Sequence, residues 1–126
     1  MTEKFDKSYK LCSHKIIDAI FQERKNLKSY PFYINFIETA LPTDKSLQFV
    51  ISVPKKRFKR AVDRNRIKRL MKEAIRKTKW PLEQYLNENK RQIAIFIVYM
   101  PQEELKYDFM LEKMEQILTK FKNQIA

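Results

Sequence analysis

The chain has 126 residues and contains no glycine, although average usage near 7% would give about nine. Glycine adopts positive φ angles at little steric cost, and its lack of a side chain lets a backbone approach a phosphate closely. The sequence therefore excludes the glycine-rich phosphate loops of P-loop and Rossmann proteins. We expect its turns to use proline, asparagine and aspartate instead.

Nearly all of the net charge lies in one segment, residues 55–79. It holds 13 Lys or Arg against two acids, Asp63 and Glu73, and so carries +11 of the formal net charge of +12. A nearly neutral scaffold with one cationic segment is typical of proteins that bind a polyanion. A solvated charged face is the alternative reading, but such faces usually mix both signs of charge.

The same segment has the apolar spacing of an amphipathic helix. Its apolar positions are Ile67, Leu70, Met71, Ala74 and Ile75. At about 100° per residue, the opposite face carries Asn65, Lys68, Arg69, Lys72 and Arg76, with Arg64 and Lys79 on one flank and Arg66 on the other. We expect one face of this helix to be buried in a core and the other to present a row of cations.

The remaining patterns predict an α+β fold, a single α/β sandwich with the element order α-β-β-(β)-α-β-α and a mixed sheet of three to four strands. One RNA-binding domain is expected to span residues 1–126. In chain order, the expected parts are a flexible arm (1–10), a helix (14–23), a polar connection (24–29), two strands (32–37 and 47–53), the basic helix, a small helical insert (82–90), a strand (93–99) and a helix from residue 101 to about 122.

The strand at residues 93–99 is β-branched or aromatic at almost every position, so we expect it to be central and buried on both faces. The two earlier strands are expected to pair with each other in an antiparallel arrangement, because a short turn joins them.

Composition also bounds the environment of the protein. Its single cysteine excludes an internal disulfide and fits a reducing cytoplasm, and the N-terminal residues lack the apolar core of a signal peptide. The longest apolar run, residues 93–100, is too short to span a bilayer. We therefore expect a cytoplasmic protein with no membrane partner, no small-molecule ligand and no metal site of its own.

Two stretches resemble a known family. Residues 52–56 read SVPKK, and residues 61–74 read AVDRNRIKRLMKEA. Together they resemble the signature of the bacterial ribonuclease P protein component, strongly over residues 49–76, fairly over 10–37 and only in topology beyond 80. The resemblance implies a left-handed β-α-β crossover around the basic helix, whereas general sterics favour the right-handed form in about 98% of cases.

The resemblance also implies a function. The protein would be the subunit of a ribonucleoprotein endonuclease that removes the 5′ leader from precursor tRNA, and its partners would be that tRNA and a catalytic RNA subunit. The RNA subunit would supply the active site and its Mg²⁺ ions, so no catalytic residue and no cofactor is assigned to the protein. The residues that the resemblance places on RNA are Lys55, Lys56, Arg64, Asn65, Arg66, Lys68, Arg69, Lys72 and Arg76.

The family also has a cleft that receives the single-stranded leader, beside the first helix and the first strand. The candidates for it here are Ile17, Phe21, Phe32, Tyr33 and Phe36. Single-stranded RNA is commonly held by stacking of bases on aromatic rings, although core packing explains the strand aromatics equally well.

Three other functions remain as alternatives on the residues alone. A structural RNA-binding protein of the ribosomal type would share the charge but lack the signature helix. A DNA-binding regulator would read the major groove with the basic helix, but no turn and recognition-helix pair is visible. A protein-only nuclease would need a set of metal ligands, and none is recognisable.

Overall fold

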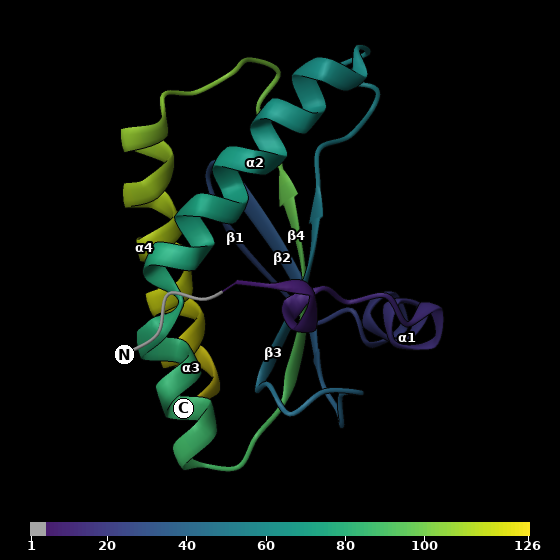
Figure 1. The fold of residues 1–126 in the computed structure, drawn as a ribbon, viewed down its shortest axis with the longest axis vertical. Coiled ribbons are helices and arrows are strands. Elements are labelled where there is room, and N and C mark those ends of the chain that lie inside the picture. The colour runs from purple at the N-terminus through teal and green to yellow at the C-terminus, as the bar shows by residue number, and fades with distance from the viewer. Residues whose placement is uncertain (1–4) are drawn as a thin grey trace.

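The computed structural model describes residues 5–126, which form one four-stranded sheet with helices on both faces (Figure 1). Helices α2 and α4 lie on one face, and α1 lies on the other. In chain order the elements are η1 (Lys7–Tyr9), α1 (His14–Glu23), β1 (Asn26–Ser29), β2 (Phe32–Glu38), β3 (Leu47–Ser52), α2 (Ala61–Thr78), α3 (Trp80–Glu88), β4 (Ile93–Tyr99) and α4 (Tyr107–Ile125).

The strand order is β1-β2-β4-β3, which confirms β4 as a central strand. It pairs antiparallel with β2 and parallel with β3. The prediction that β2 and β3 pair with each other is therefore wrong, because β4 lies between them. The prediction that residues 24–29 are only a polar connection is also wrong. Asn26–Ser29 forms β1, which pairs antiparallel with β2 and places Ser29 opposite Phe32.

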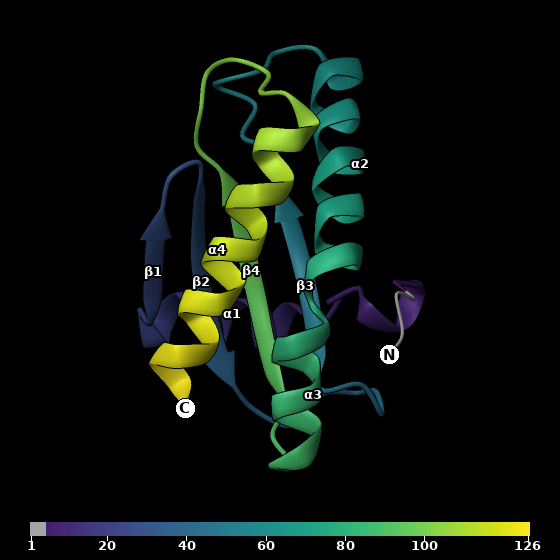
Figure 2. The ribbon, with the colours of Figure 1, turned by 90° about the vertical axis from the view of Figure 1, so that its left-hand side faces the viewer.

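The connection from β3 to β4 has the unusual hand. Figure 2 looks onto the helix layer, with β3 and β4 both running upward and β3 to the right of β4. The chain leaves the top of β3, descends through α2 and α3 in front of the sheet, and enters β4 on the left. This path is a left-handed β-α-β crossover, as the resemblance implied and against the general preference.

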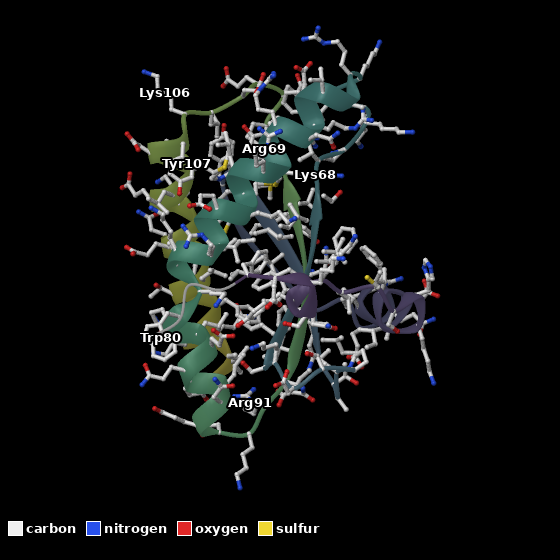
Figure 3. All side chains as sticks on the ribbon, viewed as in Figure 1. Lys68, Arg69, Trp80, Arg91, Lys106 and Tyr107 are labelled. Carbon is white, nitrogen blue, oxygen red and sulfur yellow. The ribbon has the colours of Figure 1, made fainter. Side chains whose placement is uncertain are left out.

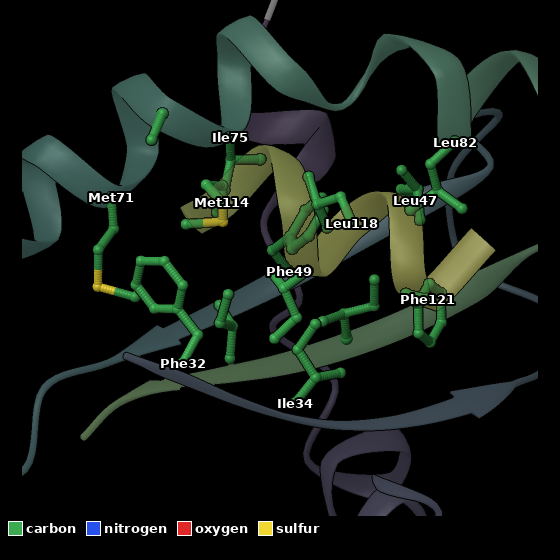
Figure 4. Packing of buried hydrophobic residues seen from close by; sticks show 14 of the residues in the cluster. Phe32, Ile34, Leu47, Phe49, Met71, Ile75, Leu82, Met114, Leu118 and Phe121 are labelled. Carbon is green, nitrogen blue, oxygen red and sulfur yellow. The ribbon is translucent and has the colours of Figure 1, made fainter. Parts of the chain in front are cut away.

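The main core lies between the sheet and the layer formed by α2 and α4 (Figure 4). From α2, the four residues Ile67, Met71, Ala74 and Ile75 are fully buried, as the spacing predicts, while Leu70 is only partly buried. Fully burying a large apolar side chain stabilises a fold by about 1.5–3 kcal/mol. This contact therefore fixes which face of α2 is left for the solvent.

Residues 7–11 are docked on the protein, so the prediction of a flexible arm over residues 1–10 is wrong for this part; residues 1–4 lie outside the described range. Tyr9 is 1% exposed. Lys10 forms a parallel bridge with Phe49 at the edge of β3, and the N–H of Leu11 donates to the Phe49 carbonyl oxygen at 3.0 Å. The segment therefore covers part of the outer edge of the sheet.

A buried ionic contact holds this segment against the helical insert, which the structure confirms as α3. Glu83 of α3 accepts from the Lys79 ammonium at 2.8 Å and from the Tyr9 hydroxyl at 2.5 Å. The Lys79 ammonium also lies 4.6 Å from the centre of the Tyr9 ring. Lys79 is 0% exposed, so its predicted place on the flank of the cationic surface is wrong.

The turns use residues other than the expected proline, asparagine and aspartate. Among the described residues, the positive φ angles occur at Arg24 (φ 57), which ends α1, and at Lys90 (φ 53), just after α3. Left-handed backbone at a residue with a Cβ costs about 1–2 kcal/mol. The last helix also begins at Tyr107 and not at residue 101, because the Tyr99 hydroxyl bonds the backbone at Glu103 and Leu105 and holds this stretch as a loop.

Candidate nucleic-acid interface

The loop that leads into α2 carries the first predicted cations. Lys55 and Lys56 lie in the turn after β3, and both are exposed. The guanidinium of Arg57 instead donates to the carbonyl oxygen of Met100. This bond joins the loop to the end of β4, so that the two exposed lysines extend from an anchored turn.

Two arginines of the signature helix are engaged within the protein. Arg64 donates to the carbonyl oxygens of Phe58 and Lys59, both at 2.8 Å. Arg66 forms two bonds with Glu104 at 2.7 and 2.8 Å and one with Asp63 at 2.6 Å. Both side chains therefore position the start of α2, the first against its loop and the second against the stretch before α4.

Beyond these arginines, α2 presents open cations. The side chains of Lys68, Arg69 and Lys72 make no hydrogen bond or ion pair within residues 5–126. Arg69 and Lys72 are exposed, as is Asn65, and Lys68 is half-buried. Figure 3 shows Lys68 on the side of α2 that is turned toward β3. Like charges at i and i+4, as in Lys68 and Lys72, repel each other, so this surface is best suited to a bound anion.

The acids near α2 are neutralised by arginines. Arg60 and Arg66 both pair with Asp63 at the first turn, at 2.9 and 2.6 Å. Hydrogen bonding from Arg66 also holds the pKa of Glu104 below its ordinary value. Hydrogen bonding from Arg76 does the same for the pKa of Glu73, with an Nη2 to Oε1 distance of 2.5 Å. These carboxylates stay charged at neutral pH, and their charge is matched locally. The open lysines and Arg69 therefore dominate the field of the outer face.

The five residues predicted for the leader cleft divide between the two faces of the sheet. Phe32 and Phe36 point toward α2 and α4 and belong to the main core, at 0% and 6% exposed. The structure thus removes both of them from the cleft, because a base could stack on them only if the core opened. Ile17, Phe21 and Tyr33 lie on the α1 side, where Phe21 is 49% exposed.

Two further residues on the α1 side were missed by the sequence reasoning. Phe96 of β4 packs edge-on to Phe21, with ring centres 5.0 Å apart. The ammonium of Lys28 lies 5.2 Å from the centre of the Tyr33 ring, from the neighbouring strand β1. The alternation of the strand at 93–99 was a usable signal for Phe96, since it places that ring opposite to Ile95 and Ile97.

No group of three or more His, Cys, Asp or Glu side chains within residues 5–126 is arranged to hold a metal ion. Across the same residues, no helix combines the length and the apolar character that a bilayer crossing requires. The two surfaces built above are thus a cationic face on α2 and a mixed aromatic and apolar face beside α1.

Comparison with known proteins identifies relatives of this arrangement. The family model described as Ribonuclease P matches residues 5–122. Two curated proteins named ribonuclease P protein component, from two strains of Porphyromonas gingivalis, are each 38% identical over 94 residues, which is 75% of this chain and 67% of the relative.

Solved structures share the fold at lower identity. The RNase P protein from Staphylococcus aureus superposes with a TM-score of 0.65 at 18% identity, covering 90% of this chain and 94% of that one. The RNase P protein from Thermotoga maritima gives a TM-score of 0.66 at 20% identity, covering 88% and 96%.

Proposed function

The chain belongs to the ribonuclease P protein family, and on this premise we propose that it is the protein subunit of a ribonucleoprotein that cuts the 5′ leader from precursor tRNA in the cytoplasm. In this proposal an RNA subunit forms the active site and binds the Mg²⁺ ions that the reaction uses. The protein binds that RNA and the leader, and no side chain of the protein takes part in bond cleavage.

The outer face of α2 binds the RNA subunit in this proposal. The observation that carries it is the cluster of Lys68, Arg69 and Lys72. Their side chains have no partner within residues 5–126, and all three lie within the stretch 61–74 that resembles the family signature. Arginine suits bidentate contacts with phosphate and lysine suits point-charge contacts. Lys55 and Lys56 extend the same surface from the anchored loop.

Arg64 and Arg66 act mainly as positioning residues. Their bonds to the loop carbonyls and to Glu104 set where α2 begins. Arg76 is held in the same way by Glu73. The predicted RNA contacts of these three arginines, and of Asn65, stand as part of the proposal.

The leader lies against the α1 side of the sheet. Phe21, Tyr33 and Phe96 offer ring surfaces there, and Lys28 places a cation over Tyr33. Unpaired bases stack on such rings with little regard to sequence, at about 1–3 kcal/mol per base. This suits a subunit that must accept the leaders of many different tRNAs.

The experiment is reconstitution with precursor tRNA. We expect the purified protein alone to leave the substrate intact, and the protein together with its RNA subunit to lower the Mg²⁺ concentration needed for half-maximal cleavage. Arg69→Ala/Lys72→Ala should lose most of that effect, while Glu88→Gln, an exposed change on α3, should retain it. Cleavage by the protein alone, or an unchanged Mg²⁺ requirement, would contradict the proposal.

A further inference from the structure

We propose that a groove between residues 5–11, the edge of β3 and α2 binds one unpaired nucleotide of the RNA subunit, with the base inside and the phosphates on the rim. This inference rests on the proposed function and goes beyond it by assigning a separate pocket. The groove has a volume of ≈ 560 Å³, within the range of about 300–1,000 Å³ of small-ligand pockets.

The inner wall of the groove is aromatic and apolar. Phe5 stacks on Tyr9 with ring centres 5.3 Å apart and planes at 28°, and it meets Phe49 edge-on at 5.6 Å. Phe5 is only partly buried, so one part of its ring surface is open toward the groove. Val50 and Ile51 of the edge strand continue this apolar lining.

The rim carries four lysines from two elements. Lys7 and Lys10 come from the N-terminal segment, and Lys68 and Lys72 come from α2. Asp6 is the one acid on the lining, and its carboxylate accepts from the backbone N–H of Ser8 at 2.9 Å, within its own turn. An apolar wall under a cationic rim matches a nucleotide, which has an aromatic base and an anionic phosphate.

The wall is held in place before any ligand arrives. The Tyr9 hydroxyl bonds to Glu83, Gln48 donates to the Ser8 carbonyl oxygen at 3.0 Å, and Leu11 is bonded to the backbone of β3. A preformed site avoids the ordering cost that a mobile segment would add to binding. This also gives α3 a role, because α3 supplies the carboxylate that anchors Tyr9.

The position of the groove selects the RNA subunit over the leader. Lys68 and Lys72 belong both to the groove and to the open cationic face of α2. The pairing of Lys10 and Leu11 with β3 fixes the N-terminal segment at the outer edge of the sheet, where α2 lies beside the groove. A nucleotide in the groove is therefore continuous with the RNA on α2.

The first test uses a neutral substitution. Phe5→Ala should weaken binding of the RNA subunit about tenfold, within the range for loss of one base–aromatic contact, and should leave the slope of log affinity against log salt unchanged. Lys68→Ala should instead lower the magnitude of that slope by about 1. Phe109→Ala, an exposed ring on α4 outside the groove, is the matched control and should bind as the unsubstituted protein does.

The possible results separate this inference from the proposed function. Unchanged affinity for Phe5→Ala would overturn the groove site while leaving α2 as an RNA surface. Failure of the unsubstituted protein to bind the RNA subunit at all would overturn the proposed function itself.

A second test does not depend on the folding of a truncated side chain. A photoreactive phenylalanine analogue at Phe5 should crosslink in the assembled complex to a single unpaired nucleotide of the RNA subunit, and the same analogue at Phe109 should not. A crosslink from Phe5 to the leader of precursor tRNA, or no crosslink to RNA in the active complex, would overturn the inference.

Discussion

Glu83→Gln removes one charge from the buried contact between α3 and the N-terminal segment, and it should destabilise the protein by about 3 kcal/mol. Lys79 is 0% exposed and Glu83 is 3% exposed, and removing one partner of a buried pair typically costs about 3–5 kcal/mol because a charge is left uncompensated. The Tyr9 ring, 4.6 Å from the Lys79 ammonium, still offers it some stabilisation. We therefore expect the lower end of the range.

Thermal unfolding followed by circular dichroism measures the effect. At about 4 °C per kcal/mol for a domain of this size, the midpoint should fall by roughly 12 °C, and the Leu11 amide should lose protection from hydrogen exchange as residues 7–11 loosen. Glu88→Gln on the same helix is the matched control, since an exposed change usually stays within about 0.5 kcal/mol. A midpoint for Glu83→Gln within about 2 °C of the unsubstituted protein would refute the reasoning.

Three further predictions follow from the same structure. Arg69→Ala/Lys72→Ala should weaken RNA binding while leaving the melting temperature nearly unchanged. If about six cations meet phosphates, the log affinity of the unsubstituted protein should fall against log salt with a slope near −4 to −5. An affinity that does not change with salt would exclude phosphate contacts. Arg24→Gly and Lys90→Gly should each raise the free energy of unfolding in urea by about 0.5–1 kcal/mol, because glycine relieves the left-handed backbone; a loss of stability in both would count against this. Hydrogen bonding from Arg66 lowers the pKa of Glu104. The stabilisation by the Glu104 carboxylate is therefore fully present above its ordinary pKa of 4.5 and is lost as the pH falls through its lower pKa in the folded protein. Glu104→Gln should make the loss of stability in acid shallower, and a pH profile identical to that of the unsubstituted protein would contradict this.

The parts of the fold that sequence reasoning predicted correctly are those with strong periodicity. The basic helix α2 and the strand β4 have patterns that only one burial arrangement satisfies, and both were found as expected. The pairing of β2 with β3 failed for a reason already present in the sequence. A strand buried on both faces needs a neighbouring strand on each side. The sequence predicted only two other strands, β2 and β3, so a central β4 must lie between them and keep them from pairing.

The missed elements are short, polar and held by partners distant in the chain. β1 spans only Asn26–Ser29, and its pattern differs little from a loop until it pairs with β2. The docked segment at residues 7–11 depends on Glu83, more than seventy positions later in the chain. No local pattern encodes such contacts, and the chirality of the β3 to β4 connection likewise came only through resemblance.

The signature helix shows why residue type alone did not define the candidate site. Sequence reasoning treated its cations as one group, but the structure divides them by what each side chain bonds. Arg64 and Arg66 use their planar groups to bond loop carbonyls and Glu104, a task that needs several donors in fixed geometry. Lys68, Arg69 and Lys72 have no partner within residues 5–126, so their charge is available to a polyanion. The residues that orient the helix and those that would grip RNA are thus adjacent in sequence, and substitutions in the first group should lower stability while substitutions in the second should lower affinity.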